Sequence, residues 1–490
     1  MIHLPLMLVV FYLAMAFITP LLGRLKKFSS RYFGVAVSAA GLLIVGATAF
    51  HVFDAGPFRY FPGNWASPVG IEIVVDEITV LLQLTIAVIG FLVSVYSVDD
   101  LDREIDERMH NWFYVIYFLM MAALNGLVMS FDLFNIFVFT EIGTLTACAM
   151  VAIKSKRVCL RAAINYLILS TLGSGMILMG IALIYMVTGH LNIGAVAQVL
   201  PEATEAFTWN VRIALSLFVV GFGIKSALFP LHLWLPDAHS SAPTPSSALL
   251  SGVVLKVFIV VIGRIVFQMF GVELFVQIPI PLVILTLATM GIFLGSLFAI
   301  TQTDIKRMLA YSSVAQVGYI FMGIALVSAR GATGGLLHIF NHAVMKSLLF
   351  TAAGAIIYKT GIRKIDDLNG IGYKMPLTMA AFGVGALSMV GIPGTSGFFS
   401  KLWLALGALD AGQPFFVLVI IISSLLNSVY YLPIIVRAFF GGGSGKFTMD
   451  QLPWKMLLPL VILAAINLYF GILPGSLVRL AEQAAAIWLH

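Results

Sequence analysis

Apolar runs of about 20 residues recur along the whole chain, and they limit the possible folds more than any other feature. A helix of that length spans the hydrocarbon core of a bilayer. We count about 14 such runs, and none shows the apolar–polar alternation that is typical of membrane strands. The sequence therefore predicts an all-α polytopic membrane protein and argues against a β-barrel.

Composition supports this prediction and narrows the kinds of site. Of the 490 residues, 60% are hydrophobic and only 10% are charged, against about 25% charged in a soluble domain. The two cysteines, Cys148 and Cys159, exclude a disulfide framework and a metal site built on thiolates. We expect no cofactor and no metal. The net charge of +6 fits basic cytoplasmic loops better than binding to nucleic acid.

The basic residues fall mostly in every second loop, which predicts an orientation. Placing these loops in the cytoplasm puts both termini outside, and the first charges follow the first apolar run, so we expect no cleaved signal peptide. The opposite loops hold only Arg59, Arg212, Arg264, Arg330 and Arg479. The cytoplasmic set is Arg24, Lys26, Lys27, Arg31, Arg103, Arg108, Lys154, Lys156, Arg157, Arg161, Lys306, Arg307, Lys359, Arg363, Lys364, Lys374, Arg437, Lys446 and Lys455.

A few ionisable residues remain inside the apolar runs. A charge at the centre of a membrane helix costs about 2.5–3.5 kcal/mol on insertion scales, so such residues are usually functional. A carboxylate beside a lysine is either a static salt bridge or a proton switch, and one pair alone does not decide between them. A series spread over several helices favours a proton path. The series is Glu141, Lys225, Lys256, His338, His342, Lys346 and Lys401.

Spacing adds detail to this series. His338, His342 and Lys346 follow one another at intervals of four residues, so they share one helix face and could pass protons through water. Two histidines at this spacing can also bind a metal, but the glutamate of the zinc protease motif is missing. We therefore favour a proton relay over a metal site.

Two apolar runs are interrupted near a lysine. Gly221–Asp237 (GFGIKSALFPLHLWLPD) contains two prolines, and Gly391–Lys401 (GIPGTSGFFSK) has a Gly/Pro break. Broken helices are common at transporter ion sites. The recurrence predicts two inverted five-helix repeats, 111–270 (helices 4–8) and 277–441 (helices 9–13), between helices 1–3 (1–110) and a last helix with a short tail (442–490).

Two polar groups near the helix ends have open interpretations. His232, Asp237 and His239 are either a proton intake or polar residues that cap a helix end. The acidic cluster Asp99–Glu107 suggests either the metal–diphosphate carboxylates of membrane prenyl transferases or a solvated loop. We favour the loop, because no second acidic motif accompanies it.

Six stretches resemble the antiporter-like subunits shared by respiratory complex I, Mrp-type cation/proton antiporters and membrane-bound hydrogenases. These stretches run in family order, and Lys401 together with the short tail is most similar to the Mrp D-type and hydrogenase-type subunits. They are FDLFNIFVFTEI (131–142), GIKSALFPLHLWLPDAH (223–239), APTPSSALLSGVVLK (242–256), TQTDIKRMLAYSSVAQVGY (301–319), HIFNHAVMKSLLF (338–350) and GIPGTSGFFSK (391–401).

The resemblance implies a role for each matching residue. Glu141 and Lys225 match the paired glutamate and lysine of helix 5 and broken helix 7, and Lys256 matches the connecting lysine of helix 8. His338 and His342 match the central relay, and Lys401 matches the terminal charge on broken helix 12. The implied protein is a proton-translocating subunit in a bacterial or archaeal plasma membrane. It would work beside homologous and small hydrophobic subunits, with H⁺ and possibly Na⁺ as the transported ions.

Other functions remain open from the sequence alone. Within the family, the complex is either an Mrp-type Na⁺/H⁺ antiporter, a hydrogenase-type complex or a complex I-like oxidoreductase; in a redox complex, this chain would move ions without carrying a redox centre. Outside the family, the alternatives are a stand-alone transporter of a small solute, a membrane enzyme and a quinone-binding subunit. No paired-carboxylate, thiolate or quinone motif favours the last two.

Overall fold

The computed structural model describes residues 2–25, 28–441, 450 and 452–489, and nearly all of them lie in helices. The α-helices are α1 (Leu4–Leu22), α2 (Ser30–Ala55), α3 (Glu77–Glu104), α4 (His110–Met129), α5 (Leu133–Ala152), α6 (Arg157–Thr188), α7 (Ile193–Ala206), α8 (Thr208–Lys225), α9 (Leu235–Ser241), α10 (Thr244–Leu249), α11 (Leu255–Arg264), α12 (Gly271–Gln277), α13 (Ile280–Ile300), α14 (Ile305–Ala325), α15 (Ala329–Thr360), α16 (Ile371–Lys374), α17 (Pro376–Val390), α18 (Ser396–Asp410), α19 (Phe415–Phe440), α20 (Trp454–Ile472) and α21 (Gly475–Leu489).

Short elements complete the fold. Two three-residue strands, β1 (Phe58–Tyr60) and β2 (Ile73–Val75), pair antiparallel with Phe58 opposite Val75. Two π-helical segments, η3 (Leu250–Val254) and η4 (Ile265–Phe270), join α10, α11 and α12 into one long helical stretch. Three single 3₁₀ turns are η1 (Pro62–Asn64), η2 (Glu107–Met109) and η5 (Ile365–Asp367).

Twelve helical stretches in the described residues are long and apolar enough to cross a membrane. Two more crossings are interrupted, one between α8 and α9 and the other between α17 and α18. Counting each interrupted pair as one crossing gives 14 among the described residues, in agreement with the sequence. The prediction of an all-α polytopic membrane protein is confirmed. The inverted repeats and the domain boundaries stay predictions.

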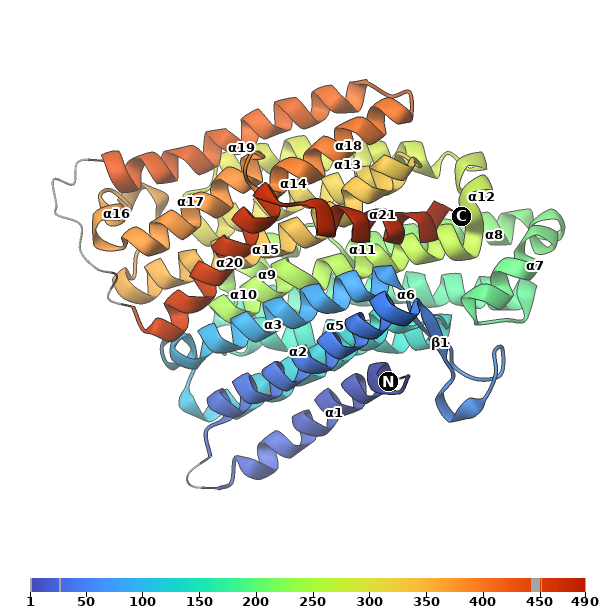
Figure 1. The fold of residues 1–490 in the computed structure, drawn as a ribbon, viewed down its shortest axis with the longest axis horizontal. Coiled ribbons are helices and arrows are strands. Elements are labelled where there is room, and N and C mark those ends of the chain that lie inside the picture. Colours follow the sequence, from blue (N-terminus) through green and yellow to red (C-terminus); the bar gives the residue numbers. More distant parts are fainter. Residues whose placement is uncertain (1, 26–27, 442–449, 451, 490) are drawn as a thin grey trace.

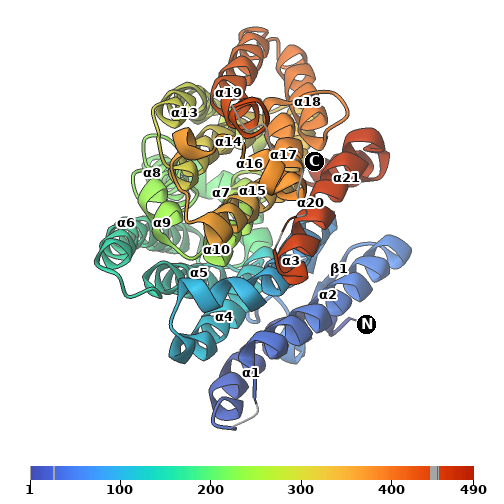
Figure 2. The ribbon, with the colours of Figure 1, turned by 90° about the vertical axis from the view of Figure 1, so that its left-hand side faces the viewer.

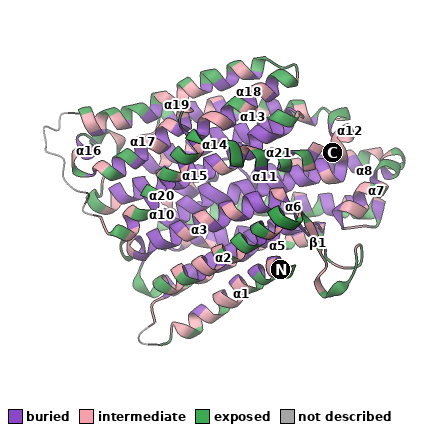
Figure 3. Ribbon diagram, in the orientation of Figure 1, coloured by how far each residue is buried: buried purple, intermediate pink, exposed green. Residues whose placement is uncertain are grey.

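The core of the bundle consists of its most completely buried helices. The α10–α12 stretch, α14 and α15 are almost completely buried, whereas α1, α2, α13, α19 and α20 leave more than half of their apolar windows uncovered (Figure 3). Viewed along the helices, α15 lies at the centre, with α14 and α17 beside it and α1 and α2 at the periphery (Figure 2).

The ends of the bundle differ in the loops that they carry. The end of α1, the beginning of α2 and α16 lie toward the left in Figure 1, whereas β1, α7, α12, the beginning of α1 and the end of α21 lie toward the right. The predicted cytoplasmic loops thus gather at one end, which we call the basic end. Lys26, Lys27 and Lys446 of that prediction lie outside the described residues.

Two basic residues assigned to loops are in fact buried. Arg264 is 2% exposed and binds Asp76, and Lys306 is 1% exposed and donates to the carbonyl oxygen of Ala242. Both lie at the ends of helices, where a hydropathy profile does not separate a buried charge from a loop charge. The assignment of these two residues to loops was therefore wrong.

The acidic cluster at Asp99–Glu107 is not a solvated loop as a whole. Helix α3 continues to Glu104, and Asp100 is only 1% exposed. Glu104 forms an ion pair with Lys154, which lies between α5 and α6. The prediction failed because the charges along this segment alternate between a buried and an exposed side of one helix.

Candidate functional site

The first helix interruption places a lysine at a helix end inside the bundle. Helix α8 stops at Lys225, and the backbone turns through Ala227, which has a φ of 59°. The Ile224 carbonyl oxygen, near the end of α8, accepts from the Trp234 indole N–H over 2.9 Å as well as from the Ala227 backbone N–H. A cation is favoured at a helix C-terminus, because the exposed carbonyls carry partial negative charge. The break therefore supplies a natural place for the Lys225 ammonium.

Lys225 meets Glu141 across three helices. Its Nζ atom lies 3.3 Å from Glu141 Oε1 and donates to Thr144 Oγ1 and Ser174 Oγ over 2.7 and 2.6 Å. The Ser174 hydroxyl also donates to Glu141 Oε1. Lys225 is completely buried, whereas 31% of the Glu141 side chain is exposed. Helices α5, α6 and α8 thus build one hydrogen-bonded ion pair, with the lysine facing inward.

Lys256 is held by a second kind of helix irregularity. Its Nζ atom donates to the carbonyl oxygen of Ser251, within the π-helical segment η3. A π-helix changes the usual hydrogen-bond pattern and can leave a carbonyl available, which is why such segments occur at functional sites. Ser251 also shares a hydrogen bond of 2.9 Å with Ser313 of α14. Lys256 is 1% exposed.

His338 and His342 lie at the centre of the bundle on α15. Their rings are nearly parallel, with centroids 5.7 Å apart. His338 pairs through Nδ1 with Ser400 Oγ and through Nε2 with Gln316 Oε1, each over 2.9 Å. Neither ring nitrogen of His342 has a protein partner. Buried polar groups are normally hydrogen-bonded, so bound water is the expected partner of His342.

Lys346 lies one turn further along α15 and points to α14. Its Nζ atom donates to the Leu309 carbonyl oxygen over 2.7 Å and to the Ser312 hydroxyl. It also lies 3.5 Å from the Tyr431 hydroxyl of α19. The predicted shared face of the two histidines and Lys346 is therefore present, and both His338 and Lys346 form hydrogen bonds with α14.

Lys401 lies just after the second interruption, on α18, and binds the end of the helix before it. Its Nζ atom donates to the carbonyl oxygens of Met389 and Val390, the last two residues of α17, over 2.9 Å each. It also donates to Ser424 Oγ over 3.0 Å and faces the Tyr319 ring. Lys401 follows Ser400, the partner of His338, so the second break adjoins the histidine pair.

The structure brings the predicted residues together to different extents. His338, His342 and Lys401 form one continuous group with their polar partners, and Glu141 and Lys225 form another. In the described part of the chain, no direct hydrogen bond joins Lys225 to Lys256. Any transfer between these two lysines therefore needs water.

The residues of the possible intake lie around α9. Asp237 pairs with Arg307 over 2.9 Å and is partly exposed. His232 is 3% exposed and stacks on Phe229. His239 is completely buried, and both of its ring nitrogens lack a protein partner. His239 is therefore the member of this group that lies deepest.

Comparison with known proteins identifies the family. Residues 130–427, which contain every residue of the site, match the family model described as NADH:quinone oxidoreductase/Mrp antiporter, TM. The chain belongs to this family. It is an antiporter-like subunit of a multisubunit membrane complex, as the sequence predicted.

Similar proteins occur in more than one kind of complex. The chain is 39% identical to NADH-quinone oxidoreductase subunit N of Desulforudis audaxviator, over 99% of both chains. It is 31% identical to the D-type subunit of the Na(+)/H(+) antiporter of Alkalihalophilus pseudofirmus, over 91% of this chain and 90% of that one. Among solved structures it resembles a chain of the membrane-bound sulfane sulfur reductase, an archaeal respiratory complex, with 29% identity and a TM-score of 0.93 over 99% and 98% of the chains.

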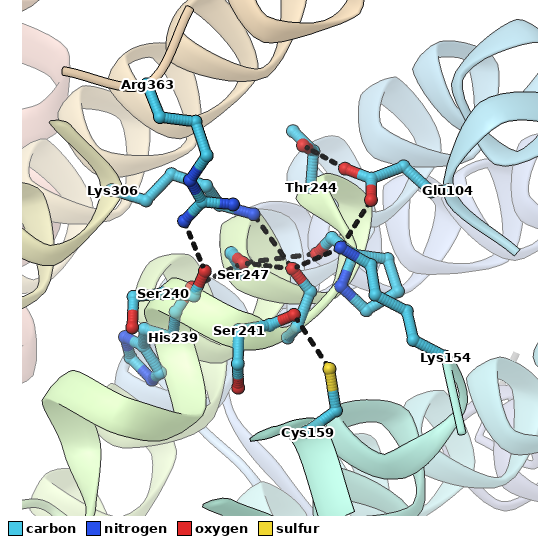
Figure 4. Close-up of polar contacts among 12 residues, drawn as sticks. Glu104, Lys154, Cys159, His239, Ser240, Ser241, Thr244, Ser247, Lys306 and Arg363 are labelled. Carbon is cyan, nitrogen blue, oxygen red and sulfur yellow. Dashed lines mark hydrogen bonds and ion pairs between the residues drawn. The ribbon is translucent and has the colours of Figure 1, made fainter. Parts of the chain in front are cut away.

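The antiporter-like subunit also contains a polar cluster that the sequence did not reveal. Glu104, Lys154, Lys306 and Arg363 converge on the turn between α9 and α10 (Figure 4). Lys306 lies at the start of α14, and Arg363 follows the end of α15. The two residues come together because α14 packs beside α15. The one signal in the sequence was the spacing of Asp100 and Glu104, which lie four residues apart and therefore share one helix face.

Proposed function

We propose that this subunit moves protons across the membrane through Glu141, Lys225, Lys256, His338, His342 and Lys401. The contact between Glu141 and Lys225 at the break between α8 and α9 carries this proposal. Charged residues in the membrane interior are costly, so those that occur there are usually functional. This pair also lies beside an irregular backbone, as transporter ion sites do.

The pair can act as a switch because the attraction between the two charges depends on the distance between the side chains. The Glu141 carboxylate stabilises the ammonium form of Lys225 by charge attraction. When the two side chains separate, Lys225 loses this stabilisation and releases its proton. The proton then passes through water to neutral Lys256 and on through His342 and His338 to Lys401. His232, Asp237, His239 and Lys346 line the route from the basic end.

The exposed side of Glu141 supports a partner subunit in the membrane. The same face of α5 exposes Phe134, Val138 and Leu145, and 31% of the Glu141 side chain is uncovered among them. A carboxylate facing lipid tails is costly. A neighbouring membrane subunit that covers this face would remove the cost and would be placed to move Glu141.

Two energy sources for this switch are candidates. The similarity to a subunit of NADH-quinone oxidoreductase favours a redox module, and the similarity to a subunit of a Na(+)/H(+) antiporter favours exchange for Na⁺. Mild extraction from native membranes, followed by mass spectrometry of the co-purifying subunits, separates them. Iron–sulfur or nickel subunits would indicate a redox complex, whereas small hydrophobic subunits alone would indicate an antiporter.

Substitution of the pair tests the proposed proton path. We expect Lys225→Ala and Glu141→Ala to abolish proton transport by the complex in proteoliposomes, because each removes half of the switch. Lys156→Ala and Glu202→Gln, at exposed positions, serve as matched controls and should transport normally. Assembly is measured by size-exclusion chromatography. Full transport by an assembled Lys225→Ala or Glu141→Ala complex would refute the proposal.

A further inference from the structure

A pocket opens at the basic end of the bundle. It has a volume of about 480 Å³ and lies between the end of α3 and the residues that follow α15. Asp100, Glu104, Tyr358 and Arg363 line it. A pocket of this size holds many water molecules, so it can connect solvent to the side chains at its base.

Asp100 is the unusual member of this lining. Asp100 is 1% exposed, and its Oδ2 atom has no hydrogen-bond partner among the described residues. A buried charged oxygen without a partner is strongly unfavourable, and natural proteins rarely leave one. A proton or a water molecule from the pocket would supply the missing partner.

The surrounding cations are already engaged. Lys154 pairs with Glu104, and Lys306 donates to the carbonyl oxygen of Ala242 over 2.8 Å. Arg363 binds Asp304 and the carbonyl oxygen of Ser240 over 2.7 and 3.0 Å, and Arg103 donates to the carbonyl oxygen of Tyr358. Lys359 also lines the pocket, and these five positive charges oppose binding of Na⁺ at Asp100. The same charges disfavour protonation of Asp100, whereas its burial and the neighbouring Glu104 carboxylate favour it.

The cluster leads from the pocket to α9. Thr244, at the start of α10, donates to Glu104 Oε1 over 3.1 Å. Lys306 holds the Ala242 carbonyl, and Ser247 donates to the His239 carbonyl over 2.7 Å. Figure 4 shows these side chains gathered around the turn that carries His239. The His239 ring is buried, and both of its nitrogens lack a hydrogen-bond partner among the described residues, so it is the acceptor that a proton path inward from this cluster would use.

We propose that Asp100 and Glu104 form the proton-loading site of this subunit, with Lys306 as a positioning residue. A hydronium ion in the pocket transfers its proton to the Asp100 carboxylate and leaves as water. The proton then passes through water to a ring nitrogen of His239 and restores the carboxylate. Lys306 acts by holding the α9–α10 turn, and with it the end of α9 that carries His239. This inference rests on the proposed proton path and deepens it.

Transport by matched variants on one helix tests the loading site. Asp100→Asn should lower the initial rate of proton transport by the complex in proteoliposomes by at least about tenfold, whereas Asp100→Glu should retain most of it. Asp102→Asn, whose side chain is 51% exposed two residues away, is the control and should change little. A normal rate with Asp100→Asn, or an equal loss with Asp102→Asn, would overturn the inference.

Chemical labelling tests the site without any transport. Cys148 and Cys159 are first replaced by alanine, and Asp100→Cys is then treated with a charged, membrane-impermeant methanethiosulfonate. We expect modification from the side of the basic loops alone, because the pocket opens there. Absence of labelling from that side, in a variant that assembles, would contradict an aqueous path to position 100.

The two proposals fail in distinguishable ways. If Lys225→Ala abolishes transport while Asp100→Asn does not, the proton path stands and the loading site is refuted. If Lys225→Ala transports normally, the proton path itself is refuted, and the loading site is refuted as well, even if position 100 is labelled.

Rescue by arginine tests the positioning role of Lys306. Lys306→Arg should restore the transport rate that Lys306→Ala loses, since arginine can still donate to the Ala242 carbonyl. Failure of this rescue would refute the positioning role.

Discussion

At the scale of the residue, buried charges in this subunit are satisfied mainly by backbone that the helices leave free. Lys401 binds the last carbonyls of α17, Lys256 binds a carbonyl in a π-helical segment, and Lys306 binds the carbonyl after α9. A low-dielectric interior makes such contacts strong and their loss costly. The position of each lysine is therefore fixed by a helix irregularity as much as by an acidic partner.

Arg264 and Asp76 provide the clearest stability test at this scale. Arg264 donates to both Asp76 oxygens over 3.0 and 3.1 Å and to the Val128 carbonyl over 2.7 Å. Arg264→Leu leaves a buried carboxylate without its partner, so we expect a loss of about 3–5 kcal/mol in the free energy of unfolding. The measurement is thermal or denaturant unfolding of the purified complex in detergent.

The double variant separates charge from packing at this pair. Arg264→Leu with Asp76→Asn removes both charges and keeps an oxygen that caps α3, so it should be more stable than Arg264→Leu alone. Arg330→Ala removes a pair that is about half exposed and should cost no more than about 1 kcal/mol. An equal loss in the free energy of unfolding for Arg264→Leu and Arg330→Ala would show that the buried pair contributes no more to stability than the exposed one.

At the scale of the element, close packing of α6 against α8 sets the geometry of the ion pair. A Cβ atom at Gly221 would lie 2.7 Å from the Ile177 side chain and 2.8 Å from the Gly173 carbonyl oxygen. Gly221 lies one turn before Lys225, and Gly173 adjoins Ser174, its hydrogen-bond partner. Only two glycines facing each other let the helices approach closely enough for that contact.

Widening this contact should impair transport without touching a charged group. Gly221→Ala would push α8 away from α6 and lengthen the contact between Lys225 and Ser174, so we expect slower proton transport by an assembled complex. The matched control is Gly175→Ala, since a Cβ atom there meets nothing within 4 Å. Proton transport by proteoliposomes measures both. Unchanged transport with Gly221→Ala would mean that the ion pair tolerates the displacement.

At the scale of the whole molecule, charge is distributed unevenly between the two ends of the bundle. The connections that carry most of the lysines and arginines gather at the basic end, while α7 and both ends of the chain lie toward the other (Figure 1). Under the positive-inside rule the basic end faces the cytoplasm. The pocket beside Asp100 would then open to the cytoplasm.

Labelling of single cysteines in intact cells tests this orientation. Lys156→Cys lies at the basic end and Glu202→Cys on α7, and both positions are exposed. We expect an impermeant maleimide to label Glu202→Cys from outside, and Lys156→Cys only after the membrane is permeabilised. The reverse pattern would invert the orientation and place the proposed loading site outside.

The class of fold, the interruptions and most of the buried charges could be predicted from the residues alone. Apolar length, proline and glycine act locally, so the crossings, the two breaks and the series from Glu141 to Lys401 could be located without a structure. The six matching stretches added the family, which the comparisons confirmed.

Which of these charges meet depends on the tertiary packing. Asp76 and Arg264 lie 188 residues apart in sequence, and Lys306 reaches Ala242 across 64 residues. Such contacts depend on the rotation and separation of whole helices, which packing fixes and local composition does not record. Sequence patterns therefore assigned Arg264 and Lys306 to loops and left Asp100 in solvent, because a charge at a helix end has the same hydropathy whether it faces water or a partner.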